Sequence, residues 1–228
     1  MISAKTHSAS VAQKVSRNAY NCKYECDNRS KEVITEDEDH LLHAAVLTEN
    51  VKLVTHLVDI LSRNSAASSI DCFNISLQTP LHLAVCVGNE DIIRILIEKG
   101  GASLHLVDRN GNNVLHLAVK YEKRACIKLL LNYLRNNDKV LNALNNDGLA
   151  PLHLACHCKH FEEIIVALVR GGVDVDVVDG LSGRTPLMYA LQNFHRNTKL
   201  HQLLLTLKCD PWLADYSGNK PIDLLQNI

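Results

Sequence analysis

The stretch Gln78-Thr79-Pro80-Leu81-His82-Leu83-Ala84-Val85 decides the fold, because copies of its core recur along the chain. Aligned on the letters Leu-His-Leu-Ala, the copies begin at Leu42, Leu81, Leu115, Leu152, Leu187 and Ile222. Successive copies are 39, 34, 37, 35 and 35 residues apart. A period of this length is typical of one supersecondary unit that buries its apolar face against the next copy. The sequence therefore predicts about six stacked units.

Each letter of this core favours a helix that begins near Pro80. Thr79 can cap the helix by accepting a hydrogen bond from a free N–H one turn in, and proline suits the first helical position, where no donor is needed. Leu81 and Leu83 supply the core, and Ala84 lets neighbouring helices approach closely. We interpret the repeated histidine as structural: we expect it to hydrogen-bond across the turn between repeats, with no catalytic or metal-binding role.

The period near 33 and the pattern Thr-Pro-Leu-His-x-Ala resemble the ankyrin repeat. This resemblance implies an all-α repeat fold, an ankyrin-repeat solenoid of about six helix-turn-helix repeats joined by β-hairpin tips. We expect a flexible N-terminal arm over residues 1–38 and an ankyrin-repeat domain over residues 39–228. The expected repeats span residues 39–72, 73–107, 108–144, 145–178, 179–213 and 214–228, the last of them a half repeat that caps the array.

The second repeat carries the clearest helix signals. We expect helices at Thr79–Gly88 and Glu90–Lys99, the second of them ended by Gly100-Gly101, because glycine readily takes the left-handed conformation. The step of 39 residues comes from a polar loop that we expect at Ser62–Ser69, and the step of 37 from a few extra residues at Arg135–Leu144.

Composition excludes several classes of function. The 228 residues are 46% hydrophobic with a formal net charge of -1, so the chain has no general attraction for nucleic acid. It contains no run of eighteen apolar residues and no signal-peptide pattern, which predicts a soluble intracellular protein. We therefore expect its eight cysteines to be reduced thiols, several of them within apolar helical patterns.

Charge changes abruptly before the first repeat. Residues 1–35 carry six Lys/Arg against three Asp/Glu, and the run Glu36-Asp37-Glu38-Asp39 follows. Two readings of this acidic run stay open. It favours a helix N-terminus, where negative charge is stabilising, or it forms a docking face for a basic partner segment.

The segment His153–His160 is the strongest candidate for chemistry, with three histidines and two cysteines in eight residues. His153 and His157 share one helical face, so metal binding is geometrically feasible. His153, however, belongs to the repeat core, and Cys156 occupies a packing position. Cys22 and Cys26 lack a second ligand pair. The chain has no phosphate-binding loop, nucleophile elbow or HExxH motif, so we expect no enzymatic activity, catalytic residue, metal or cofactor.

Binding is the function that remains, because stacked repeats present an extended surface made of tips and first helices. Trp212 has two readings, packing beneath the last tip or acting as an exposed anchor. The recognition candidates at the tips are Asp108, Arg109, Asp147, Asp176, Asp179, Asp215, Tyr216 and Trp212.

Residues 39–228 also resemble a narrower group, the ankyrin domains of the IκB family. Phe73–Val85 is similar to the entry of that family's second repeat and Asn146–Ala155 to the entry of its fourth. Val175–Thr185 is one residue longer than in generic repeats and resembles the fifth, with Leu191-Gln192-Asn193 soon after. The count of six repeats and the extra residues after repeats one and three also fit.

The resemblance implies that the partner is a dimer of Rel/NF-κB transcription factors, whose nuclear entry, DNA binding and activity the chain inhibits or modulates. In the family, the first repeats engage a basic nuclear-localisation segment, which implies contacts at Asp37, Glu38, Asp39 and Asn50. The last repeats meet the immunoglobulin-like Rel domains. That places contacts at Asp176, Asp179, Trp212 and Tyr216.

Two departures from the family bear on regulation. Residues 1–38 contain no Asp-Ser-Gly degron, and the sequence ends at Ile228 without an acidic Pro/Ser/Thr-rich tail. This fits a constitutive inhibitor, a viral mimic, a nuclear co-regulator or a truncated chain. We expect a cytoplasmic or nuclear monomer that binds neither nucleic acid nor membrane directly. The alternative function is an ankyrin adaptor for an unrelated protein client.

Overall fold

The computed structural model describes residues 38–63, 70–135, 137–192 and 198–225. The contacts divide the chain into two compact units, with the boundary between Ala102 and Ser103. The expected N-terminal arm, apart from Glu38, lies outside the described residues. No helix within the described ranges is long and apolar enough to span a membrane.

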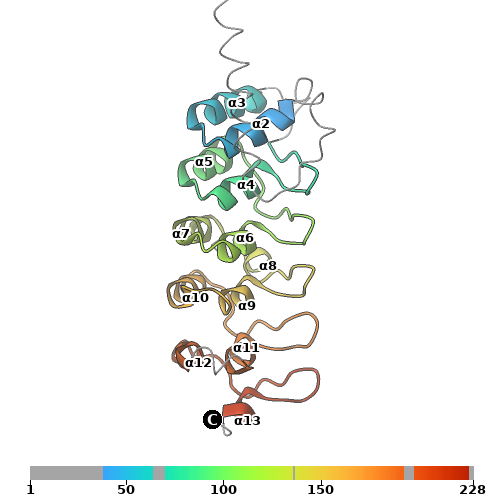
Figure 1. Cartoon of the computed structure of the whole chain (residues 1–228), viewed down its shortest axis with the longest axis vertical. Helices are drawn as coiled ribbons and strands as arrows, with labels where there is room; N and C mark the ends of the chain where they lie inside the picture. The colour runs from blue at the N-terminus through green and yellow to red at the C-terminus, as the bar shows by residue number, and fades with distance from the viewer. Residues whose placement is uncertain (1–37, 64–69, 136, 193–197, 226–228) are drawn as a thin grey trace, which may run out of the picture. The chain divides into compact units, whose positions relative to one another are not determined.

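The first unit contains two pairs of helices. The first helices of the two pairs, α2 and α4, pack against each other (Figure 1). The second helix of the first pair, α3, packs against α5 and against η2, the π-helical turn that continues α5. The bounds are Glu38–Leu47 for α2, Val51–Arg63 for α3, Pro80–Val87 for α4, Glu90–Arg94 for α5 and Ile95–Lys99 for η2.

The second unit has two rows of helices of its own. Helices α6, α9, α11 and α13 form one row, and α7, α10 and α12 form the other (Figure 1). The bounds are Val114–Lys120 for α6, Arg124–Tyr133 for α7, Asp138–Leu141 for α8, Pro151–Ala155 for α9, Phe161–Arg170 for α10, Pro186–Gln192 for α11, Thr198–Thr206 for α12 and Pro221–Leu225 for α13. This is the helix-turn-helix repeat fold that the sequence predicts.

One local expectation needs correction, and one short helix was not expected. The described residues contain no β-strand: the turns that we call tips, at residues 71–78, 108–112, 145–149, 179–184 and 215–219, are closed by single backbone pairs such as Asp108 N–H to the Asn112 carbonyl, 2.9 Å. The extra residues at Arg135–Leu144 contain the short helix α8, which the sequence did not predict. Two apolar side chains of α8, Val140 and Leu141, are buried and hold this turn in the core.

The repeated histidines are structural, as predicted. In His116, Nδ1 accepts a hydrogen bond from the Asn113 N–H (3.3 Å), and Nε2 donates to the Leu149 carbonyl of the next repeat (3.0 Å). One imidazole thus closes a helix start and also ties that repeat to the following tip. Nδ1 bonds of the same kind are made by His82 and His153, and Nε2 bonds of the same kind by His43 and His153.

The core of each unit is built from the apolar letters of the repeat. Leu81, Leu115, Leu152 and Leu187 occupy equivalent positions and are fully buried, and the second helices add residues such as Ile127. Threonine caps α4 as expected: the Thr79 hydroxyl accepts from the His82 N–H. Burial of this face leaves the tips and the outer faces of the helices exposed to solvent.

Candidate functional site

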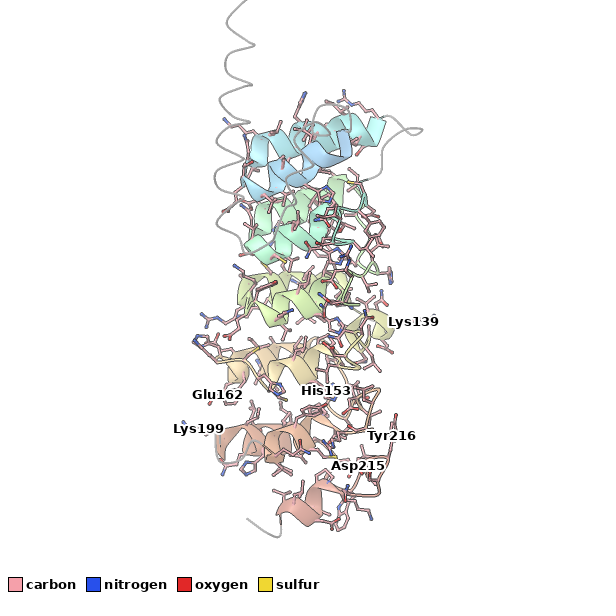
Figure 2. All side chains as sticks on the ribbon, turned by 45° about the vertical axis from the view of Figure 1, so that its right-hand side comes forward. Lys139, His153, Glu162, Lys199, Asp215 and Tyr216 are labelled. Carbon is pink, nitrogen blue, oxygen red and sulfur yellow. The ribbon has the colours of Figure 1, made fainter. Side chains whose placement is uncertain are left out.

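The tips of the second unit form a continuous row. A backbone N–H of each tip donates to a carbonyl of the preceding one: Asn146 to Asn110 at 3.0 Å, Gly180 to Gly148 at 2.8 Å, and Tyr216 to Ser182 at 2.9 Å. Figure 2 shows Tyr216 on the tip side of this unit and Glu162 and Lys199 on the opposite, helix side. Residues exposed on successive tips therefore share one surface.

Several acidic residues expected to face a partner instead hold their own tips together. The Asp108 carboxylate accepts from the backbone N–H of Asn110 (2.8 Å) and Asn112 (2.9 Å). Asp215 makes the equivalent bonds to Ser217 and Asn219, and both carboxylates are buried. A buried carboxylate that accepts from the donors of its own tip is poorly placed to meet a partner.

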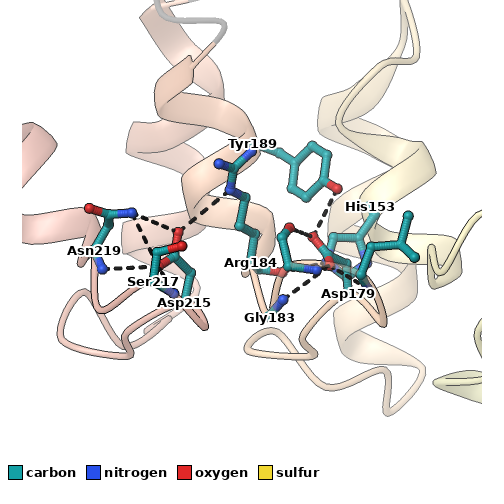
Figure 3. A network of polar contacts seen from close by, with 10 residues as sticks. His153, Asp179, Gly183, Arg184, Tyr189, Asp215, Ser217 and Asn219 are labelled. Carbon is teal, nitrogen blue, oxygen red and sulfur yellow. Dashed lines mark hydrogen bonds and ion pairs between the residues drawn. The ribbon is translucent and has the colours of Figure 1, made fainter.

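Asp179 is the most strongly held of these carboxylates (Figure 3). It accepts hydrogen bonds from the N–H groups of Leu181, Ser182 and Gly183, from the Ser182 hydroxyl at 2.7 Å and from the Tyr189 hydroxyl at 2.9 Å. Its side chain is only 1% exposed. Burial alone would raise the pKa of Asp179, but the bonds from Ser182, Tyr189 and Leu181 outweigh it and lower the pKa to about 2. The group is therefore an ionised anchor within the tip.

The same network joins two neighbouring tips. The Arg184 carbonyl accepts from His153 Nε2 at 3.0 Å, and the Arg184 guanidinium lies 3.6 Å from the Asp215 carboxylate (Figure 3). The pKa of Asp215 is lowered, first by the hydrogen bond from the Asn219 side chain. This arrangement fixes the backbone that carries the exposed residues.

Large apolar or aromatic side chains also reach solvent at or beside the tips of the second unit, and the most exposed of them are Leu181, Tyr216 and Trp212. Leu181 is 76% exposed and lies over Gly148, Tyr216 is 70% exposed and lies over Gly183, and Trp212 is 61% exposed. Arg109 and Asp147 are exposed polar neighbours. Of the two readings of Trp212, the structure supports the exposed one. We define the tip surface as Arg109, Asp147, Leu181, Trp212 and Tyr216.

The other candidates from the sequence are bonded within their own unit or lie outside the described residues. Asp176 is half-buried and accepts from the Asp210 N–H at 2.8 Å, and burial raises its pKa. Asn50 is exposed and caps α3 through the Leu53 N–H, 3.1 Å. Asp37 and the side chains of Glu38 and Asp39 lie outside the described residues. The proposed roles of all candidates in binding stay predictions.

Sequence reasoning missed the exposed apolar residues of the tips. Besides Leu181, the tip of the first unit exposes Phe73, Ile75 and Leu77. Leu77 has a backbone φ of 54°, in the left-handed region where equivalent positions such as Gly111 have glycine. A non-glycine residue in this conformation lowers the stability of the fold, and such strained positions cluster at functional sites. The sequence did contain one sign of this exposed residue, because Leu77 stands where the later tips have glycine.

The cysteine and histidine cluster at His153–His160 is not organised for chemistry. Burial raises the pKa of the Cys156 thiol to about 12 and that of Cys158 to about 11, so both are protonated and weakly nucleophilic near neutral pH. Within the described residues, no three His, Cys, Asp or Glu side chains gather to hold a metal ion. The described cysteines are free thiols.

The buried histidines make the stability of the second unit depend on pH. Burial lowers the pKa of His116 to about 4, although bonds to the Leu149 and Ala143 carbonyls oppose the shift, and burial also lowers the pKa of His153. Unfolded histidine titrates near 6.5. The folded state therefore binds fewer protons than the unfolded chain between pH ~6.5 and ~4, and stability is lost as the pH falls through that window.

We expect the free energy of unfolding to fall by roughly 3 kcal/mol from pH 7 to pH 4 on account of His116 alone. Urea denaturation at a series of pH values measures it. The His116→Gln variant should be less stable at pH 7 but should lose less stability on acidification. An equal pH slope in both proteins would contradict the assignment.

Comparisons with known proteins agree with this architecture. A family model of ankyrin repeats in three copies matches residues 1–108, 42–140, 100–179 and 134–215. The B-cell lymphoma 3 protein homolog of Mus musculus is 34% identical over 83% of this chain, and the NF-kappa-B inhibitor epsilon of Homo sapiens is 35% identical over 67%. The chain spans 41% of the length of the first relative and 30% of the second.

A solved structure is similar along most of its length. The crystal structure of the ankyrin repeat domain of Bcl-3, described as a unique member of the IκB family, superposes with a TM-score of 0.75 and is 34% identical. The match covers 83% of this chain and 80% of that one. The chain is thus an ankyrin-repeat protein. More narrowly, it belongs to the IκB family, as its repeat entries and long fifth tip predict.

Proposed function

We propose that this chain regulates NF-κB by binding a Rel/NF-κB dimer through the tip surface, and that binding inhibits or modulates the dimer's nuclear entry, DNA binding and transcriptional activity. The observation that carries the proposal is the exposure of Leu181 and Tyr216 on one row of tips and of Trp212 just before the last tip. Exposed aromatic and large apolar side chains are the usual energetic anchors of protein interfaces. Membership of the IκB family supports the choice of partner.

The tips are held in a fixed shape that favours tight binding. The Asp179 network and the backbone bonds between tips hold Leu181 and Tyr216 in place before any partner arrives. Preorganised side chains lose less conformational entropy on association, so more of their contact energy appears as affinity. The acidic run at residues 36–39 remains the proposed contact for a basic segment of the Rel subunit.

The tip surface is tested by aromatic truncation. Trp212→Ala and Tyr216→Ala should each weaken binding of a purified Rel/NF-κB dimer by about tenfold or more, as expected for interface anchors. Isothermal titration calorimetry measures the affinity. Lys199→Ala, on the helix side of the same unit, is the matched control and should bind as the unmodified chain does.

Failure of the unmodified chain to bind any Rel/NF-κB dimer would favour the alternative, an ankyrin adaptor for an unrelated client. A gel-shift titration with labelled κB-site DNA then separates two modes of regulation. An inhibitor removes the dimer from the probe, whereas a co-regulator forms a slower ternary band. Unchanged affinity in both aromatic variants would overturn the tip surface while leaving the partner in place.

A further inference from the structure

A groove of about 890 Å³ runs along the helix side of the second unit between α7 and α10, with α8 at one end. The Arg124 guanidinium meets the Glu163 carboxylate at 2.7 Å near the starts of both helices. Near the ends of both helices, Leu131 packs against Gly171, and a Cβ added to Gly171 would lie 2.6 Å from the Leu131 side chain. The two helices therefore run side by side in the same direction, and the groove follows them.

The groove is lined by three basic side chains that have no ion pair within the part of the chain that the structure describes. Lys128 and Arg135 come from the α7 side, and Arg170 comes from the end of α10. All three are exposed. A basic residue at a helix end is favourable in any helix because it faces the partial negative charge of the free carbonyls. That reason covers Arg135 and Arg170 but not Lys128, which lies mid-helix.

Three acidic residues also line the groove, and only one of them, Asp138, lies at the end where the two arginines are. Glu163 is paired with Arg124. Glu162 lies at the first turn of α10, at the end of the groove away from Arg170. Asp138, at the start of α8, is the carboxylate that remains near Arg135. The groove therefore has a basic end and an acidic end, with Lys128 between them.

The floor of the groove is apolar. Leu131 and Leu141 are buried beneath it, while Val166 and Ala167 of α10 are half-exposed along it. From Glu162 to Arg170 the helix rises by about 12 Å at 1.5 Å per residue, which is enough for a short peptide segment. An occupant that satisfies both parts of the lining needs carboxylates for the arginines and apolar side chains for the floor.

We propose that this groove binds an acidic peptide segment that carries apolar side chains, oriented with its carboxylates at Arg135 and Arg170. Charge complementarity sets the sign and the orientation, and contact with Val166 and Ala167 supplies the apolar part. The tip-surface residues do not line the groove. The proposal therefore goes beyond dimer binding and adds a second surface, available while the tips are occupied.

The test uses a fluorescein-labelled 16-residue synthetic peptide of aspartate and glutamate with leucine at helical spacing. Fluorescence anisotropy against the full chain should show saturable binding that weakens with salt. The double reversal Arg135→Glu/Arg170→Glu should weaken it by about tenfold or more, since it replaces attraction with repulsion. Glu162→Lys should strengthen it. The control Lys199→Glu/Lys208→Glu changes the net charge equally and should bind as the unmodified chain does.

Three results would overturn the proposal: no binding of the peptide, equal loss in the control variant, or equal binding by a peptide with every leucine changed to serine. Dodecanoate is the small-molecule competitor, and displacement of the peptide at equal concentration would reassign the groove to small amphiphilic anions. The double reversal should leave affinity for a Rel/NF-κB dimer unchanged. Failure of the groove to bind the peptide can therefore be told apart from failure of the proposed function.

Discussion

Replacing Asp179 with alanine is expected to destabilise the second unit by about 3 to 4 kcal/mol, because unmade bonds to buried donors are costly. The substitution leaves the donors of Leu181, Ser182, Gly183 and Tyr189 without their common acceptor. Several of these donors are partly buried, so water replaces the carboxylate only in part. The tip that carries Leu181 then loses its fixed shape.

Urea denaturation followed by far-UV circular dichroism measures this loss. Asp147→Ala is the matched control, because Asp147 is an exposed aspartate in the preceding tip, and it should change stability by no more than about 0.5 kcal/mol. Because the pKa of Asp179 is depressed to about 2, its contribution is present above pH ~4 and disappears as the pH falls toward 2. Equal midpoints for the two variants at pH 7 would refute the role of the network.

Gly111→Ala should cost about 3 kcal/mol, because backbone strain and a steric overlap add together. Gly111 has φ +74°, and a Cβ placed there would lie 2.7 Å from the Asn146 backbone nitrogen. That nitrogen donates to the Asn110 carbonyl, so the clash falls on the bond that joins two tips. Neither backbone can move without breaking it.

Gly218→Ala separates strain from overlap. Gly218 has φ +84°, but an added Cβ there would have no neighbour within 4 Å. It should therefore cost only the conformational strain, about 1 kcal/mol. Thermal unfolding of both variants measures the difference, and equal losses of stability would mean that the contact with Asn146 relaxes freely.

The fold was predictable because the repeat letters have fixed local roles. The sequence predicts helices at Thr79–Gly88 and Glu90–Lys99, and the structure has α4 and then α5 with η2 over nearly the same residues. The change to π-helical geometry at Ile95 was not predictable, because one extra residue per turn leaves no mark in a 3.6-residue pattern. Helix α8 was missed because its four residues are too few to show a period.

The positions of the tips were predictable from the repeat, but the structural role of their aspartates was not. Charge led to Asp108, Asp179 and Asp215, yet a tip needs an acceptor at its first position, and these carboxylates fill that need. Whether an aspartate serves its own backbone or a partner depends on the turn geometry, which spacing does not reveal. Leu181 was passed over for the opposite reason: apolar residues are expected in the core, and only the fold shows that this one faces solvent.

The imidazoles of His116 and His153 also set how the second unit comes apart. His116 reaches forward to Leu149, and His153 reaches forward to Arg184. Each helix pair is thus completed by its successor along the chain. Fraying from the C-terminal end strips the acceptor from the preceding histidine and loosens that repeat in turn, so unravelling spreads backward in ordered steps.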